Sequence, residues 1–120
     1  MNSRQKAYKK GIMAEYLAAM YLWLSGYRIL KRRYKTPVGE IDVLVEKRKM
    51  IVAVEVKSRK HIHEGLEAVN SKTQQRIERA VLHFLSHNPA YNEHDIRFDV
   101  FVFAWPFHIR HLDNAWRARS

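Results

Sequence analysis

The sequence predicts a single α/β domain in which helices flank a β-sheet. The chain has 120 residues, of which 47% are hydrophobic, and a chain of this size forms one domain with a core of its own. Two long segments carry apolar residues at helical spacing, and several short segments show the alternating or continuous apolar pattern of strands. Their order is helix, three strands, helix and two strands, which is typical of a layered α/β domain.

The first predicted element is a helix over about residues 4–24, which Ser25 and Gly26 end. Large apolar side chains at helical spacing are expected to face the core. They are Met13, Tyr16, Leu17, Met20, Tyr21 and Leu24. The basic and apolar run superficially resembles a signal peptide, but Glu15 interrupts it and the run is shorter than the ~18 residues of a membrane span. We interpret it as a core-packing helix.

Three strands are predicted next, over about residues 27–34, 40–46 and 50–58, with "KTPVG" and "EKRKM" as the turns. A second long helix is predicted over about 65–87, ending before Pro89. Its apolar face comprises Ile77, Ala80, Val81, Phe84 and Leu85. Residues 96–104 are almost continuously apolar, which predicts an interior strand covered on both faces. After Pro106, "FHIRHL" predicts a short edge strand.

The charge balance points to a polyanionic partner. Lys and Arg number 22 against 12 Asp and Glu, a formal net charge of +10, which favours nucleic acid or an anionic membrane surface. We predict nucleic acid rather than a membrane, and a generally basic protein without such a partner is the alternative. The absence of Cys excludes disulfides, a thiolate nucleophile and a Cys-based zinc site. A cytoplasmic location is therefore expected.

Charged residues lie inside the predicted hairpin at positions 40, 42, 55 and 57. Alternation places Glu40 and Asp42 on one face of their strand, with Ile41 on the other face together with Val43. A turn that is symmetric about residues 48 and 49 makes the numbers of opposed residues sum to 97. This register opposes Asp42 to Glu55 and Glu40 to Lys57, with Cβ atoms about 4.5–5.5 Å apart.

Two opposed carboxylates repel each other, and a divalent cation such as Mg²⁺ would relieve that repulsion. A charged strand end without a ligand is the alternative for Asp42 and Glu55. A structural pair with Lys57 is the alternative for Glu40.

Glu15 extends this pattern from the first helix. It shares a helical row with Gly11, Ala18, Ala19 and Leu22, small and apolar residues that let the helix approach a sheet closely. A carboxylate there requires a cation, a metal or a hydrogen-bond donor. A salt bridge to Lys57 or Arg59 is the structural alternative.

Basic residues form two candidate surfaces for nucleic acid. On the second helix, Lys72, Arg76, Arg79 and His83 recur at spacings of four, three and four. The segment "KRRYK", residues 31–35, adds a second cluster. The residues that we predict to bind nucleic acid are Arg33, Arg59, Lys72, Arg76 and Arg79. A solvated polar helix face is the alternative for the stripe.

Other features have structural interpretations at least as good as functional ones. The pairs His61 with His63 and His83 with His87 each lack an evident third metal ligand, so phosphate contact or an ordinary surface role is expected. Asp99 either serves the site or forms a buried pair with an arginine such as Arg97. The two tryptophans Trp105 and Trp116 are core, base-stacking or interface residues.

These motifs resemble a known group of enzymes. Asp42 followed by "EVK" at 55–57, with an upstream helical Glu15, resembles the PD-(D/E)XK nuclease superfamily and, within it, the archaeal Holliday-junction resolvases. More closely, "GEIDVLVE", "AVEVKSR", "RFDVFVF" and "HLDNAW" resemble the bacterial YraN-like proteins, an uncharacterised family. Ile41 stands where the proline of the superfamily's motif name would be.

The resemblance implies a restriction-endonuclease-like domain spanning residues 1–120, with a central mixed sheet. It implies a Mg²⁺ or Mn²⁺ site formed by Asp42, Glu55 and the Val56 carbonyl, with Lys57 beside the attacking water and Glu15 assisting. The expected activity is hydrolysis of structured or branched DNA, and a symmetric homodimer is expected by analogy. A non-catalytic nucleic-acid-binding or adaptor module that keeps the fold is the alternative.

Overall fold

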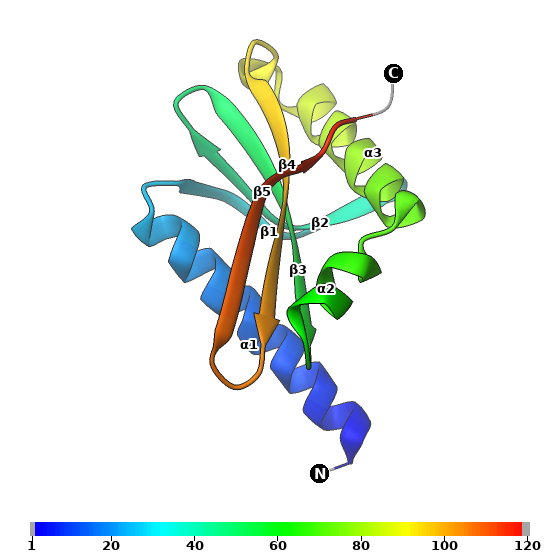
Figure 1. The fold of residues 1–120 in the computed structure, drawn as a ribbon. Helices are drawn as coiled ribbons and strands as arrows, with labels where there is room; N and C mark the ends of the chain where they lie inside the picture. The colour runs from blue at the N-terminus through cyan, green and yellow to red at the C-terminus, as the bar shows by residue number, and fades with distance from the viewer. Residues whose placement is uncertain (1, 119–120) are drawn as a thin grey trace.

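The computed structural model describes residues 2–118 and contains a five-stranded sheet with helices on both faces (Figure 1). The elements are α1 (Ser3–Leu24), β1 (Arg28–Thr36), β2 (Gly39–Lys47), β3 (Met50–Arg59), α2 (Ile62–Ala68), α3 (Ser71–His87), a 3₁₀ turn (Pro89–Tyr91), β4 (Asp95–Ala104) and β5 (His108–Trp116). The strand order is β1-β2-β3-β4-β5, with β3 and β4 parallel and the other neighbours antiparallel. The predicted α/β fold with a central mixed sheet is confirmed.

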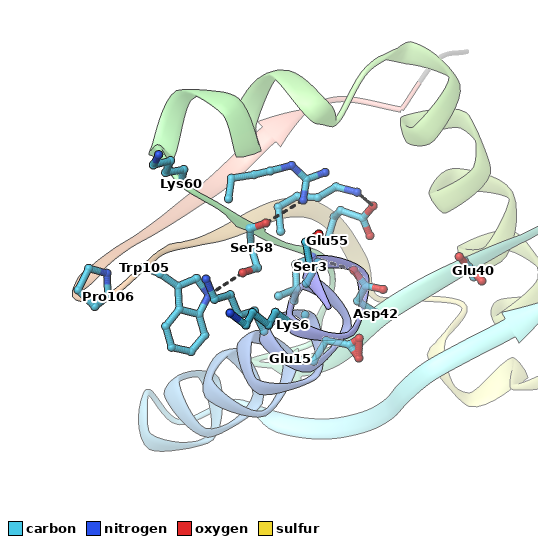
Figure 2. Close-up of a pocket in the computed structure, with 16 residues that line it drawn as sticks. Ser3, Lys6, Glu15, Glu40, Asp42, Glu55, Ser58, Lys60, Trp105 and Pro106 are labelled. Atoms are coloured by element: carbon cyan, nitrogen blue, oxygen red, sulfur yellow. Dashed lines mark hydrogen bonds and ion pairs between the residues drawn. The ribbon is translucent and has the colours of Figure 1, made fainter. Parts of the chain in front are cut away.

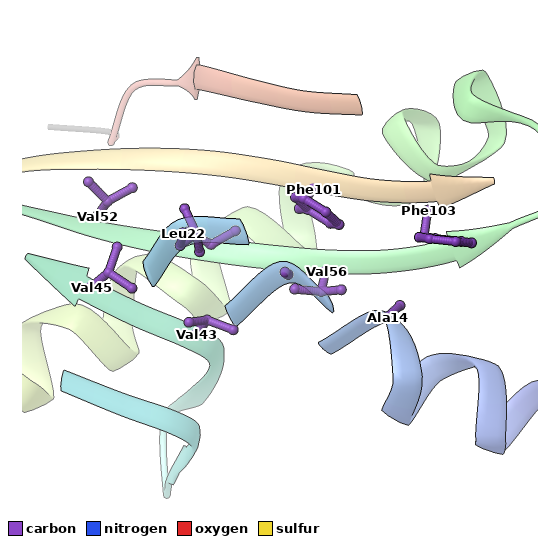
Figure 3. Close-up of a cluster of buried hydrophobic side chains, with 10 residues drawn as sticks. Ala14, Leu22, Val43, Val45, Val52, Val56, Phe101 and Phe103 are labelled. Atoms are coloured by element: carbon purple, nitrogen blue, oxygen red, sulfur yellow. The ribbon is translucent and has the colours of Figure 1, made fainter. Parts of the chain in front are cut away.

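Helix α1 covers one face of the sheet through small residues. A capping box between Asn2 and Gln5 caps its N-terminus, and it ends at Leu24 with Ser25 as the C-cap, before Gly26 in a left-handed conformation (φ 93°). Ala14, Ala18 and Leu22 are its fully buried residues, and they pack on a layer of valines and phenylalanines from β2, β3 and β4 (Figure 3).

The predicted core-facing stripe of α1 is therefore wrong. Met13, Tyr16, Met20 and Leu24 are 51%, 58%, 52% and 72% exposed, and Tyr21 is 42% exposed. From the predicted stripe, Leu17 packs against this core and the Tyr21 ring lies 5.6 Å from that of Phe101. Because bulky side chains of the sheet already fill this layer, only the row of small residues lets the helix approach.

The second predicted helix is two helices. Helix α2 ends at Ala68, and α3 begins at Ser71 with the Asn70 side chain accepting a hydrogen bond from the Thr73 backbone at 3.1 Å. An N-cap of this kind satisfies a free backbone donor and starts a new helix. The face of α3 predicted to be apolar does pack on the sheet, through Ile77, Ala80, Val81 and Phe84.

The β2–β3 hairpin has the predicted register. Arg48 and Lys49 form the turn with φ of 52° and 59°, and Val43 opposes Val54, so that opposed numbers sum to 97. The described β2–β3 pairing stops at this pair. Beyond it β2 stays with β1 only, and strict alternation fails, since Ile41 packs on the α3 side whereas Val43 packs on the α1 side.

Gly39 fixes where this diverging end of β2 lies. A Cβ atom on Gly39 would be 1.8 Å from the backbone oxygen of Arg76, so only glycine permits this approach of β2 to α3. The close approach draws the β2 segment that carries Glu40 and Asp42 toward α3 and away from β3.

Strand β4 is interior, as predicted, because it pairs with β3 on one side and β5 on the other. Strand β5 is the predicted edge strand but extends further, to Trp116. None of the helices in the part of the chain that the structure describes is long and apolar enough to cross a membrane.

Candidate functional site

A cavity of about 970 Å³ opens where β2 separates from β3. Its walls come from the first half of α1, the start of β2, the end of β3 and the turn between β4 and β5. The four predicted catalytic residues line it together, Glu15, Asp42, Glu55 and Lys57, and the three acids are labelled in Figure 2. Residues from three elements that are far apart in the sequence thus meet in one place.

Asp42 occupies the position where the β2–β3 ladder ends. Its Oδ2 accepts a hydrogen bond from the Val56 backbone N–H at 2.8 Å, so a side chain replaces the next backbone bond of the ladder. The N–H and C=O of one strand residue point to the same side. The Val56 carbonyl is therefore directed to the side of β3 that carries Asp42.

Glu55 is a buried acid beside a second acid. It is 8% exposed, and its Oε2 lies 3.4 Å from the Lys57 Nζ. Burial, together with the neighbouring Asp42, raises the pKa of Glu55 to about 9, although the Lys57 ammonium acts in the opposite direction. The raised pKa means that this pair of acids has less positive charge around it than two carboxylates require.

Glu15 is held by an arginine that the sequence did not indicate as its partner. The Arg33 Nε–H donates to Glu15 Oε1 at 2.7 Å, and this hydrogen bond raises the pKa of Arg33. The partner predicted as an alternative, Lys57 or Arg59, is thus replaced by Arg33 from β1. Arg33 adopts a left-handed conformation with φ of 49°. Its side chain anchors the Glu15 carboxylate in the cavity wall.

The donor atoms fit a hard divalent cation. Asp42, Glu55 and the Val56 carbonyl offer oxygen ligands, the type that Mg²⁺ and Mn²⁺ prefer, and Mg²⁺ typically uses one or two carboxylates. A cation there would also supply the positive charge that the raised pKa of Glu55 shows to be missing. Within residues 2–118 no group of three or more His, Asp or Glu side chains gathers as a metal-binding cluster.

The remaining predicted residues at this end have separate positions. Glu40 lines the cavity but lies apart from the other acids (Figure 2). The Lys57 ammonium lies against Glu55, and a Glu40–Lys57 ion pair is absent among the described residues. Arg59 is exposed on the cavity wall, where its Nη1 donates to the Ser58 backbone oxygen at 2.9 Å.

The basic stripe of α3 is only partly as predicted. Lys72, Arg76 and Arg79 are exposed, on the side of α3 opposite its core face. His83 instead lies 2.9 Å from the Tyr34 hydroxyl and stacks on His87 with ring centroids 4.3 Å apart.

The other histidine pair lies at the start of α2. His61 is the N-cap residue and His63 is inside the helix, with rings stacked 5.6 Å apart. Trp116 stacks on Phe98 and its indole N–H donates to Glu78 at 2.9 Å, which gives it a packing role.

Sequence reasoning missed cavity residues on α1 and in the β4–β5 turn. Lys6, Lys10 and Trp105 line the cavity, as does Lys60 beyond the end of β3. A signal was present for the helix, because Ser3, Ala7, Gly11 and Glu15 recur every four residues and all line the cavity. No comparable pattern marks Trp105.

Asp99 is buried elsewhere, within a complete set of donors. It is 0% exposed and accepts hydrogen bonds from Arg97 at 2.8 Å to each oxygen and from the Asn114 backbone at 3.0 Å, while the His111 Nε2 lies 2.7 Å from Oδ2. Burial would raise the pKa of Asp99, but the bonds from His111, Arg97 and Asn114 outweigh it and lower the pKa. The predicted pair with Arg97 is confirmed.

Known proteins match this chain over most of its length. A model of the uncharacterised protein family UPF0102 matches residues 14–103, a range that contains Glu15, Asp42, Glu55 and Lys57. A UPF0102 protein of Parvibaculum lavamentivorans is 44% identical over 92% of this chain and 84% of its own. A UPF0102 protein of Mesorhizobium japonicum is 42% identical over 98% and 94%. The predicted resemblance to an uncharacterised bacterial family is confirmed.

Proposed function

The chain belongs to the uncharacterised protein family UPF0102, and we propose that it is a divalent-metal-dependent endonuclease that hydrolyses phosphodiester bonds in structured or branched DNA. The observation that carries the proposal is the pair of Asp42 and Glu55 at the diverging strand ends, where Glu55 is buried with its pKa raised to about 9. Perturbed acids that line a cavity are typical of functional sites.

The reaction is the addition of water across a phosphodiester. A bond forms between the water oxygen and phosphorus, one ester P–O bond breaks, and the leaving oxygen takes up a proton. When bound by Asp42, Glu55 and the Val56 carbonyl, Mg²⁺ or Mn²⁺ supplies Lewis-acid stabilisation of the phosphoryl oxygens and lowers the pKa of water. Glu55 has to release its proton before its carboxylate acts as a ligand.

Lys57 and Glu15 have different roles in this scheme. The Lys57 ammonium, 3.4 Å from Glu55, stabilises the negative charge that develops on the phosphoryl oxygens. Glu15 lines the same cavity, and its ion pair with Arg33 fixes its orientation toward the site. Arg33 therefore acts as a positioning residue in addition to offering charge to DNA.

Charge and composition support nucleic acid as the partner and the cytoplasm as the location. The net charge of +10 offsets the local repulsion between DNA and the acids of the site. The absence of cysteine fits a reducing compartment. The homodimer expected by analogy stays a prediction.

A cleavage assay with a metal titration tests the proposal. Linear, flapped and four-way DNA are incubated with the purified chain in Mg²⁺, Mn²⁺ or EDTA, and cation binding is measured by calorimetry. Asp42→Asn should abolish cleavage and weaken cation binding without loss of fold, because an amide oxygen still accepts the Val56 N–H. If Asp42→Asn melts far below the wild type and no cation binds, the acids form a structural charge network and the non-catalytic alternative holds.

A further inference from the structure

The cavity continues well beyond the acids, along an open edge of β3. Because β2 pairs with β3 only through residues 43–47, the backbone ladder of residues 55–59 of β3 is formed with β4 alone, and the Asp42 side chain takes up the Val56 N–H on the other side. Figure 2 shows Asp42, Glu55 and Glu15 gathered on one side of the cavity, Trp105 and Pro106 on the other, and Ser58 between them. Ser58 is three residues after Glu55, a distance of about 10 Å along a strand.

Trp105 is held in a defined orientation at the far side. Its indole N–H donates to Ser58 Oγ at 2.7 Å, and its ring contacts Phe103 with centroids 4.5 Å apart. The Lys10 ammonium lies 5.7 Å from the ring centroid, so an exposed lysine side chain lies over one face of the indole. Trp105 is thus a half-buried aromatic ring with one anchored edge and a face that borders the cavity.

Positive charge lines the cavity that this ring borders. Lys6, Lys10, Arg59 and Lys60 are exposed and line the cavity, whereas its acids gather at the other side. We name Trp105, Pro106, Lys10 and Lys60 the Trp105 end of the cavity. An anchored aromatic ring within a track of cations is the arrangement that binds single-stranded nucleic acid, in which bases stack on the ring and phosphates contact the cations.

We propose that the Trp105 end of the cavity binds an unpaired segment of the DNA strand, with a base stacked on Trp105 and the adjoining phosphates against Lys10 and Lys60. This inference deepens the proposed function of the same cavity and rests on it for the choice of ligand. In a duplex both faces of a base are covered by its neighbours, so the indole reaches a base only where the strands have separated. The substrate is therefore DNA with a single-stranded segment beside the cut.

The spacing agrees with a cut close to the end of the duplex. Glu55 and Ser58, which holds the indole, are about 10 Å apart along β3, a separation that a few unpaired nucleotides span. A strand that enters the acids from a duplex places a base on Trp105 after roughly that many unpaired nucleotides. Flaps, splayed arms and opened junctions provide such a segment, whereas an intact linear duplex does not.

Binding in EDTA tests this inference without any cleavage. A labelled oligo(dT) and a blunt duplex of equal length are titrated with the wild type and with Trp105→Ala, Trp105→Phe and Lys10→Ala, and anisotropy gives each Kd. Trp105→Ala should weaken oligo(dT) binding about 5- to 150-fold and duplex binding less than about twofold, while Trp105→Phe keeps most of the affinity. Trp23→Ala is the matched control, because this tryptophan is 65% exposed near the end of α1.

Two further measurements keep the test decisive. In a Trp23→Phe/Trp116→Phe protein, oligo(dT) should quench the fluorescence of the one remaining tryptophan, Trp105, so the test survives if Trp105→Ala fails to fold. Lys10→Ala should reduce the magnitude of the salt slope for oligo(dT) by about 0.7, the value for one phosphate contact on a single strand. Equal losses on oligo(dT) and duplex, no loss with Trp105→Ala, or no quenching would each overturn the inference.

Cleavage separates this inference from the proposed function. If oligo(dT) binding depends on Trp105 but no substrate is cut in Mg²⁺ or Mn²⁺, the nuclease proposal fails and the single-strand site is supported. Suppose instead that DNA is cut, that the wild type cuts flapped and intact duplexes equally, and that Trp105→Ala does the same. The nuclease proposal then holds and the inference is overturned.

Discussion

Two buried acids lie at almost the same level of adjacent strands, and their surroundings are opposite. Asp99 on β4 is aligned with Val54, one residue before Glu55 on β3. Asp99 is surrounded by donors and its pKa is lowered, whereas Glu55 lies beside Asp42 and its pKa is raised to about 9. Burial of charge alone therefore does not identify a functional site. The acid whose charge the fold leaves uncompensated is the better candidate.

The position of each acid explains the difference. Asp99 lies on the α1 face of the sheet, where β5 brings His111 and the Asn114 backbone and β4 itself brings Arg97. Tyr27 extends this network through a 2.8 Å bond from the Arg97 guanidinium. Glu55 lies where β2 has separated from β3, so one side of its strand has no backbone partner in the described pairing and opens on the cavity.

The largest expected effect concerns the Asp99 network. Asp99→Asn leaves the Arg97 guanidinium without its carboxylate in a mostly buried position, and breaking a buried ion pair in this way costs about 3–5 kcal/mol. Urea denaturation at pH 7 measures the loss. The matched control is Asp113→Asn, which replaces an exposed acid on the neighbouring strand β5 and should change the free energy of unfolding by less than about 0.5 kcal/mol. A loss below about 1 kcal/mol for Asp99→Asn would remove the contrast between the two acids.

The network also has a pH dependence of known sign. Because the pKa of Asp99 is lowered on folding, the stability that it contributes is present above the ordinary value of 3.8 and is lost as the pH falls through the lowered folded value. Wild-type stability should fall in acid more steeply than that of Asp99→Asn.

The next effect is catalytic. Lys57→Ala should reduce the turnover of DNA cleavage by ~10²-fold, as when one stabiliser of transition-state charge is removed, and should leave cation binding in place. Single-turnover cleavage and calorimetry measure the two quantities. Lys9→Ala removes an exposed lysine of α1 that does not line the cavity and should leave both unchanged. If Lys57→Ala abolishes cation binding as well, the lysine organises the site and does not act on the substrate.

A smaller effect, of opposite sign to that of Asp99, is expected at Glu55. Its folded pKa lies above the ordinary value of 4.5, so between pH 4.5 and about 9 the folded state binds the extra proton and stability falls as the pH rises. Glu55→Gln removes this pH dependence and should raise the free energy of unfolding at pH 8, with a smaller gain at pH 5. Thermal melts at the two pH values, with Mg²⁺ absent, measure the difference. Destabilisation by Glu55→Gln at pH 8 would show that the surroundings of Glu55, like those of Asp99, stabilise the charged carboxylate.

The comparison also shows what the sequence could predict. The register of the β2–β3 hairpin followed from its turn residues, and with it the proximity of Asp42 and Glu55, because pairing geometry is local. The placement of Glu15 followed from its row of small residues on α1. The partner of Glu15 did not, because Arg33 reaches it from another element.

The errors have physical causes of the same kind. Hydrophobic periodicity predicted that the large apolar side chains of α1 face the sheet, whereas the row that contains Ala14 and Ala18 packs on it. The surface of the sheet sets the space between the two layers, and the sequence of α1 does not show that space. The break between α2 and α3 was visible in the N-cap residue Asn70, but the apolar pattern on both sides concealed it. Trp105 lines the cavity because it lies in the β4–β5 turn, and no pattern in its own segment indicates this position.

The smallest expected effect concerns where DNA approaches the molecule. If DNA approaches the side of the cavity that holds Glu55, cations near the diverging end of β2 contribute to binding. Cations in the turn at the opposite end of the β2–β3 hairpin do not. Arg76 contacts Gly39 through its backbone and therefore lies near the diverging end, with Lys72 one turn before it on α3.

Replacing Lys72 and Arg76 with alanine should reduce the magnitude of the salt slope of duplex binding by about 1.8, at ~0.9 for each phosphate contact. The matched control replaces Arg48 and Lys49, two exposed cations in the turn at the other end of the hairpin, and its slope should equal that of the wild type. Affinity measured between 50 and 200 mM salt, about the range over which such contacts change binding strongly, distinguishes the two pairs. Equal slopes for both double variants would exclude α3 from the DNA path and leave the cavity wall, with Lys6, Lys10 and Arg59, as the contact surface.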